Sequence, residues 1–208
     1  MTLYVPPQFR MDDLQAQLAL MRDNAFGTLV SGTAGGEPHV SHVPFVIECG
    51  GAGRVTLQGH VARANAHWEA LQDGARVTAI FQGPHAYVSP GWYASHPAVP
   101  TWNYAVVHAH GTARLMDEAE LHALLMTLSN AYEAGRPRPW RMSELPADYV
   151  AMMLRSIVGF EIAVERLDGK FKLSQNRAAE IPRVIAALEA EGEGALARLM
   201  REHSPAAG

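Results

Sequence analysis

The run GHVARANAHW, at Gly59–Trp68, is one of three runs in the chain that are unusually rich in aromatic residues and histidine. The other two are FQGPHAYVSPGWY at Phe81–Tyr93 and VPTWNYAVVHAHG at Val99–Gly111. Three of the four tryptophans and five of the ten histidines of the chain lie in these runs. Aromatic and histidine side chains combine flat apolar faces with polar tips, which suits a planar, partly polar ligand. The alternative is a core that happens to be aromatic over this stretch.

The first run begins where a predicted strand ends. Arg54–Gln58 is predicted as the strand, Gly59 breaks its pattern, and Ala64, Trp68 and Leu71 then recur at helical spacing. A helix that starts directly after a strand presents free backbone N–H groups and the positive end of its dipole. This junction is therefore the best candidate for a phosphate site.

Side chains at the junction add hydrogen-bond donors. The guanidinium group of Arg63 can donate two parallel hydrogen bonds to a phosphate, and His60 and Asn65 supply further donors. Thr56 and Gln58, on the strand, could place backbone amides along the edge of a flat ring. The alternative is structural: Arg63 pairs with a surface carboxylate and His60 caps the helix.

Strands outnumber helices in the rest of the chain. Their mostly antiparallel order and short connections favour a barrel or sandwich over a doubly wound sheet. The expected fold class is mainly β with peripheral helices (α+β). The predicted strands are Phe26–Ser31, His39–Ile47, Arg54–Gln58, Arg76–Phe81 ended by Gly83-Pro84, Tyr104–Leu115, and Val158–Arg166 with Lys170–Ser174 as a hairpin around Asp168-Gly169. Turns are expected at Gly35-Gly36 and Gly50–Gly53. Four helical segments are expected: one from Asp12-Asp13 to about Asn24, one that follows a capping box at Asp117 and Glu120, one near Pro146–Ile157, and one from about Ala178 to a loose tail at Ser204–Gly208.

Composition limits the classes of function. The net charge of −4 argues against a dedicated nucleic-acid surface, and the densest basic run, Arg136–Arg141, is interrupted by prolines. The single cysteine, Cys49, excludes an intrachain disulfide framework and favours a reducing compartment. No apolar run is long enough to span a membrane, and the N-terminus does not resemble a signal peptide. A cytoplasmic location is expected.

Two histidine pairs are candidates for metal ligands. His39 with His42 and His108 with His110 could each offer two ligands, but no carboxylate or cysteine lies close in sequence to complete a set. No metal site is predicted. Ser89 is not in a nucleophile elbow, and Cys49 has no flanking base, so no catalytic residue is predicted either.

The chain closely resembles the PaiB family, described as FMN-binding negative transcriptional regulators. The matching motifs follow in collinear order along most of the chain and are rich in Trp, His and Pro. They are YVPPQFR (Tyr4–Arg10), HVPF (His42–Phe45), GHVARAN (Gly59–Asn65), GPHAYVSPGWY (Gly83–Tyr93), VPTWNYAVVHAHG (Val99–Gly111), VGFEI (Val158–Ile162) and KFKLSQNR (Lys170–Arg177).

The resemblance implies an FMN-binding split β-barrel, homodimeric, with two flavin sites at the subunit interface. Residues 1–175 would form the split-barrel domain with inserted helices, and residues 176–208 a C-terminal helical extension of it. The resemblance places the phosphate near the helix at Gly59–Asn65, with Arg63 as its leading ligand. The residues expected to bind the cofactor are Gln58, His60, Arg63, Asn65, Trp92, Tyr93, Trp102, Asn103, Lys172 and Gln175.

The sequence is compatible with two classes of function. One is a regulator that holds FMN, or senses a redox ligand, and affects transcription directly or through a partner. The other is a flavin-dependent oxidoreductase of unknown substrate, because a planar cofactor site lined by His, Trp and Tyr suits redox chemistry. Haem binding or degradation is a weaker third option. The family label allows DNA as a partner, but no basic recognition helix supports it.

Overall fold

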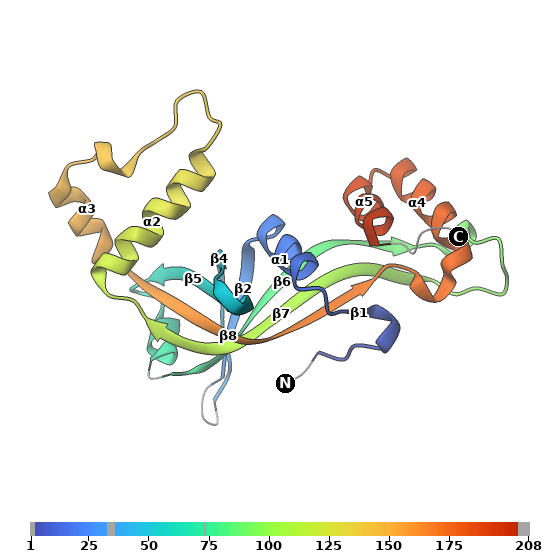
Figure 1. Ribbon diagram of the computed structural model, residues 1–208, viewed down its shortest axis with the longest axis horizontal. Helices are drawn as coiled ribbons and strands as arrows, with labels where there is room; N and C mark the ends of the chain where they lie inside the picture. The colour runs from blue at the N-terminus through green and yellow to red at the C-terminus, as the bar shows by residue number, and fades with distance from the viewer. Residues whose placement is uncertain (1–2, 33–35, 73, 204–208) are drawn as a thin grey trace. The chain divides into compact units, whose positions relative to one another are not determined.

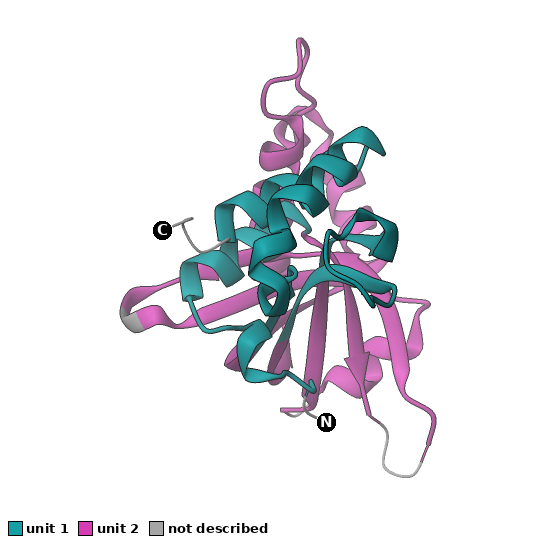
Figure 2. Cartoon of the chain, turned by 90° about the vertical axis from the view of Figure 1, so that its right-hand side faces the viewer, with its two compact units in different colours: residues 1–24, 82–108, 168–208 teal, residues 25–81, 109–167 magenta. Residues whose placement is uncertain are grey.

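A computed structural model of the chain describes residues 3–32, 36–72 and 74–203 (Figure 1). Gly35 of one predicted turn and the predicted loose tail at Ser204–Gly208 lie outside the described residues. The chain divides into two compact units, which Figure 2 colours separately. Unit 1 comprises Met1–Asn24, Gln82–His108 and Asp168–Gly208, and unit 2 comprises Ala25–Phe81 and Ala109–Leu167. The predicted domain boundary at residue 175 stays a prediction.

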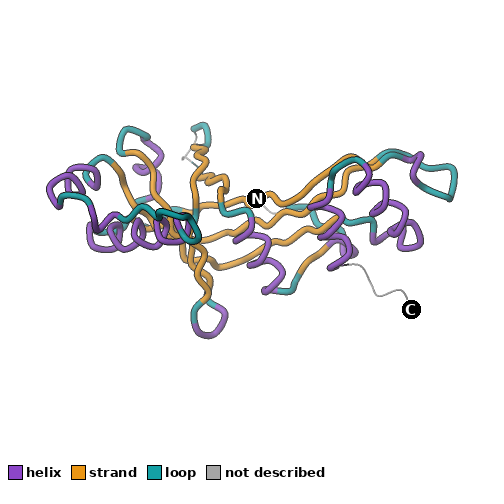
Figure 3. The backbone as a smooth tube through the Cα atoms, turned by 90° about the horizontal axis from the view of Figure 1, so that it is seen from above, coloured by secondary structure: helices purple, strands orange, loops and turns teal. Residues whose placement is uncertain are grey.

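The strands form a single sheet. Their bounds are β1 Arg10–Met11, β2 Phe26–Ser31, β3 His39–Pro44, β4 Val46–Cys49, β5 Val55–Ala62, β6 Arg76–Val88, β7 Thr101–Leu115 and β8 Ile157–Lys172. The order is β3-β2-β6-β7-β8-β5-β4, with β1 paired to β8. Strands β6, β7 and β8 contribute residues to both units. Figure 3 draws the strands as orange tubes.

Unit 2 has an aromatic core. The Phe45 ring packs edge-on against Phe81 and Phe160, at centroid distances of 5.3 Å and 6.1 Å. Phe45 also divides the predicted strand His39–Ile47 into β3 and β4, and its N–H donates to the Ala25 carbonyl over 2.9 Å. The chain bends there, so β3 and β4 stand at opposite ends of the strand order while β3 still contacts β5. The sheet therefore curls toward closure within this unit.

A second layer of unit 2 is helical. Helix α2 (Glu118–Glu133) begins with the predicted capping box, in which the Glu120 N–H donates to Asp117 Oδ1 over 2.8 Å. Helix α3 is Ala147–Leu154, and its last residue joins the leucines of α2 in one cluster. That cluster consists of Leu121, Leu124, Leu128 and Leu154 and packs against Val46 and Ile157 of the sheet.

Unit 1 carries the remaining helices, α1 (Leu14–Asp23), α4 (Ile181–Ala190) and α5 (Gly194–His203). The Asp13 carboxylate caps α1 by accepting from the Gln15 N–H over 2.8 Å. Helix α5 covers one face of the strands in this unit. Its Met200 sulfur lies 3.6 Å from Asn103 Nδ2, and its His203 ring lies 5.1 Å from the Phe171 ring.

Gly59 does not end its strand. Strand β5 continues to Ala62, and a short 3₁₀ helix, η3 (Ala66–Leu71), follows instead of an α-helix that starts after Gly59. A Cβ on Gly59 would lie 2.8 Å from Cζ of Phe160 on the paired strand. The glycine is there to admit the phenylalanine ring, not to break the strand.

The predicted strand end at Gly83-Pro84 and the predicted turn at Asp168-Gly169 are wrong for the same reason, because each glycine makes room for a neighbouring element. Strand β6 runs through Gly83-Pro84, where a Cβ on Gly83 would lie 2.8 Å from a Leu20 methyl group. Strand β8 runs through Asp168-Gly169, where a Cβ on Gly169 would lie 2.6 Å from the Met11 carbonyl oxygen. The predicted hairpin is therefore one strand, and Gly169 admits β1 at its edge. The fold class, mainly β with peripheral helices, is confirmed.

Candidate functional site

The turn after β5 is the exposed part of the predicted phosphate junction. The Arg63 N–H donates to the Ser156 carbonyl over 2.8 Å, and Arg63 Nε and Nη2 donate to the carbonyls of Arg155 and Ile157 over 2.8 Å and 3.2 Å. Trp68 Nε1 donates to the Arg63 carbonyl over 2.9 Å, and its ring lies 5.9 Å from the guanidinium carbon. Arg63 is exposed, and its position is fixed by the backbone carbonyls of Arg155 and Ile157 and by the Trp68 ring.

This turn retains donors for an anion. Within the described residues, Arg63 Nη1 and the backbone amides of Ala64 and Ala66 donate no hydrogen bond. All residues from Ala62 to Ala66 are exposed. A guanidinium N–H and free amides in one exposed turn are the donor set that a phosphate monoester needs. The residues present therefore fit the phosphate of FMN, although η3 is too short to offer a helix N-terminus.

The other three predicted residues at this junction have internal roles. Gln58 Nε2 donates to Glu161 Oε2 over 3.0 Å. His60 pairs across the sheet with Gly159, on the face that α2 covers, and its Nδ1 is buried without a partner in the described structure. Burial lowers the pKa of His60. Asn65 caps η3, because its Oδ1 accepts from the His67 N–H over 3.0 Å.

In unit 1, Trp102 presents an exposed aromatic surface. Its side chain is 54% exposed on β7, with the Tyr87 ring 6.2 Å away edge-on and the His85 ring 6.5 Å away. Lys172 Nζ donates to Thr101 Oγ1 over 2.6 Å and to the Trp102 carbonyl. Burial, with the charge of Lys170 in second place, lowers the pKa of Lys172.

Asn103 does not share that surface. It is fully buried on the opposite face of β7, where Nδ2 donates to Ser174 Oγ over 2.8 Å and Oδ1 has no partner among the described residues. Successive residues of a strand point to opposite faces, so Trp102 and Asn103, which were both expected to bind the cofactor, lie on opposite faces of β7.

The last three predicted residues lie in or beside short 3₁₀ helices. Tyr93 is buried under the Arg177 guanidinium, 4.9 Å from its ring, and burial raises the pKa of Tyr93. Trp92 is half-buried in the short helix η4 (Pro90–Trp92). Gln175 closes the end of β8 by accepting from the Leu173 N–H over 2.7 Å and donating to the Phe171 carbonyl.

Sequence reasoning missed Glu180. This buried carboxylate accepts from the N–H groups of Ala94 and Ser95 over 2.9 Å and 3.0 Å and from the Ser95 hydroxyl. The Ser95 hydroxyl and the two amides lower the pKa of Glu180 to about 2. Its partners lie some 85 residues earlier in the chain, so no local pattern could reveal them.

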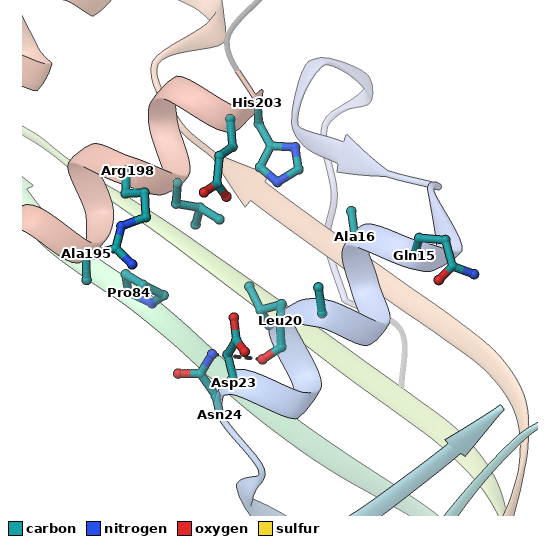
Figure 4. Close-up of a pocket in the computed structure, with 12 residues that line it drawn as sticks. Gln15, Ala16, Leu20, Asp23, Asn24, Pro84, Ala195, Arg198 and His203 are labelled. Carbon is teal, nitrogen blue, oxygen red and sulfur yellow. Dashed lines mark hydrogen bonds between the residues drawn. The ribbon is translucent and has the colours of Figure 1, made fainter.

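A pocket of about 750 Å³ lies within unit 1, between α1, α5 and Pro84 (Figure 4). Its lining combines apolar residues such as Leu20 and Leu199 with the charged residues Asp23, Arg198 and Glu202. None of the ten predicted site residues lines it. No group of three His, Cys, Asp or Glu residues that could hold a metal ion occurs in the described part of the chain. Across residues 3–32, 36–72 and 74–203, no helix is long and apolar enough to cross a membrane.

Comparison with solved structures shows the same fold. A "putative 5-nitroimidazole antibiotic resistance protein" from Bacteroides thetaiotaomicron superposes with a TM-score of 0.57 at 17% identity, over 77% of this chain and 85% of its own. The flavocytochrome Anf3 from Azotobacter vinelandii gives 0.52 at 18% identity, over 76% and 66%. The predicted split β-barrel is confirmed.

Comparison of sequences identifies the family. The protease synthase and sporulation protein PAI 2 of Bacillus subtilis (strain 168) is 35% identical over 175 residues, which cover 84% of this chain and 83% of that protein. The resemblance to the PaiB family is thereby confirmed, and FMN is confirmed as the cofactor of the family. Because the family's sequence model matches residues 3–166, this chain belongs to the family described as "Putative FMN-binding domain".

Proposed function

We propose that this protein binds FMN with the phosphate in the turn Ala62–Ala66 and acts as a flavin-dependent regulator of the PaiB type. The observation that carries the proposal is the exposed turn itself, in which Arg63 is anchored by two backbone carbonyls and retains Nη1 for a ligand. When bound, FMN would supply a redox-active ring and a phosphate dianion. Arg63 would hold the phosphate, together with the amides of Ala64 and Ala66.

The ring requires an aromatic surface, and the exposed group of Trp102, Tyr87 and His85 offers one. We place this surface on the second subunit of a homodimer, as in the split barrels that the family resembles. Each flavin would then be held by the turn of one chain and the aromatic surface of its partner. The single exposed cysteine, Cys49, is in keeping with the reducing interior of a cell.

The experiment is the visible spectrum of the purified protein, followed by titration with FMN and with riboflavin. A flavin spectrum and a clear preference for FMN over riboflavin support the proposal, because the two ligands differ only in the phosphate. A haem spectrum, or equal affinity for both flavins, would contradict it. Sedimentation of the FMN-loaded protein as a monomer would remove the dimer from the proposal.

One observation favours the alternative, a flavin-dependent oxidoreductase. Lys172 donates to the Trp102 carbonyl beside the exposed aromatic group, and its pKa is lowered by burial. A lysine of this kind can hold an anionic substrate group or transfer a proton. Oxidation of NADH or NADPH by the FMN-loaded protein, lost in Lys172→Met, would favour the enzyme over the regulator.

A further inference from the structure

His67 lies at the centre of a buried polar network in unit 2. Its side chain is 1% exposed. Its Nε2 lies 3.0 Å from Ser31 Oγ on β2, and its Nδ1 lies 2.8 Å from Ser41 Oγ on β3. The His39 ring stacks on it at 5.4 Å. An imidazole with a partner at each nitrogen is fixed in position and orientation.

One side of this network leads directly to the turn. Ser41 Oγ accepts from Asn65 Nδ2 over 3.0 Å, and Asn65 Oδ1 accepts from the His67 backbone N–H over 3.0 Å. Asn65, Ser41 and His67 therefore form a closed ring of hydrogen bonds. The other side, through Ser31, has no hydrogen bond to Asn65.

We propose that His67 is a positioning residue for the phosphate of FMN, which it serves by fixing Asn65, and with it the turn Ala62–Ala66, through Ser41. This inference rests on the proposed function. Both His67 and Ser41 are buried, so neither is expected to contact the ligand, and both act through Asn65.

The network works with a neutral ring. Asn65 donates to Ser41, so the Ser41 hydroxyl proton is free to donate to His67 Nδ1, and His67 Nε2–H then donates to Ser31. A charged ring would donate from both nitrogens and leave the Ser41 proton without its acceptor. Burial, and secondly the neighbouring His39, lower the pKa of His67 to about 4, which keeps the ring neutral near pH 7.

The two serines make a matched pair of variants. Both are buried and both bond the same imidazole, but Ser41 alone is bonded to Asn65. FMN and riboflavin are titrated into the wild type, Ser41→Ala and Ser31→Ala, and the melting temperature of each is measured. Ser41→Ala is expected to lose about tenfold in FMN affinity with riboflavin affinity unchanged, and Ser31→Ala to stay within about twofold for both.

Each outcome bears on a separate claim. Equal FMN loss in both serine variants, or equal loss of FMN and riboflavin in Ser41→Ala, overturns the positioning role. A wild type that binds FMN no better than riboflavin overturns the proposed phosphate site instead. If Ser41→Ala does not fold, His67→Asn and His67→Gln replace the serine pair. The amide of the Asn variant takes the place of Nδ1, so this variant should keep the preference for FMN over riboflavin. The amide of the Gln variant takes the place of Nε2, so this variant should lose that preference. The reverse result overturns the inference.

Discussion

Gly111 of β7 lies so close to β8 that a Cβ on it would stand 2.2 Å from the Ala163 carbonyl oxygen and 2.9 Å from its carbon. The obstacle is backbone, in the middle of the sheet, and cannot move aside as a flexible side chain can. The conformation of Gly111 itself is ordinary, since it is not among the glycines with positive φ. Space, and not backbone freedom, requires glycine at this position.

The first prediction follows from that contact. Gly111→Ala should lower the free energy of unfolding by about 3 kcal/mol or more, because the strands must separate to admit the methyl group. Gly51→Ala is the matched control, since a Cβ there meets nothing within 4 Å. Urea denaturation of both variants provides the measurement. Similar midpoints for the two would show that β7 and β8 can separate at no cost.

The elements with local signals were predictable from sequence. Strand β2 occupies the expected residues, Phe26–Ser31, and α2 begins at the expected capping box. The errors came from glycines. Gly59, Gly83 and Gly169 match the pattern of a strand break, but each admits a side chain or a strand that is distant in sequence. A glycine required for close approach and a glycine required for a turn look the same in a sequence.

The candidate site shows the same limit. Trp102 is exposed, as expected for a ligand surface, whereas Asn103 is buried. Strand β7 begins at Thr101 and not at the predicted Tyr104, so Trp102 and Asn103 already point to opposite faces of the strand. The partners of His67 could not be found in this way, because Ser41 and Ser31 lie 26 and 36 residues before it. Only the pairing of β2 with β3 brings them together.

The second prediction concerns Arg63. Arg63→Ala should weaken FMN binding about ten- to a hundredfold, the value of one charge-assisted contact, and should leave riboflavin binding unchanged. Fluorescence quenching of each flavin provides the measurement. Because Arg63 also bonds the carbonyls of Arg155 and Ile157, the melting temperature is compared too. Unchanged FMN affinity in a folded variant would remove Arg63 from the site.

The third prediction is a loss of stability in acid that depends on His67. Its pKa is about 4 in the folded chain and about 6.5 in the unfolded one, so the unfolded state binds more protons between these values. Stability should therefore decrease as pH falls from about 6.5 to about 4, by up to about 3 kcal/mol. Thermal melts across this range test it. His67→Asn should flatten the profile, and His122→Asn, an exposed histidine on α2, should not.

The fourth prediction concerns DNA. The isolated protein should bind DNA only weakly, in the non-specific range of micromolar or above at physiological salt. Its net charge is −4, and in the basic loop Arg136 is paired with Glu133, whose other oxygen accepts from the Trp140 N–H. A gel shift with the upstream region of its own gene, with competitor DNA, is the test. A nanomolar complex that survives the competitor would instead favour direct repression.

The last prediction separates the two faces of β7 with adjacent residues. Trp102→Ala removes a side chain that is 54% exposed, so it should cost less than about 1 kcal/mol of stability and should instead weaken flavin binding or dimerisation. Asn103→Ala removes a buried donor to Ser174 and should cost about 1–3 kcal/mol. Urea denaturation, FMN titration and sedimentation are measured on both variants.

If the Trp102 side chain filled the interior of its own chain, its loss would cost about 3–5 kcal/mol of stability, as for other buried tryptophans. A Trp102→Ala protein that melts this much earlier, yet binds FMN and dimerises normally in the cold, would remove this face of β7 from the ligand site. In the expected result, Trp102→Ala stays stable, while Asn103→Ala is destabilised but still binds FMN. That result assigns the exposed face of β7 to the ligand or the partner subunit, and the buried face to the core.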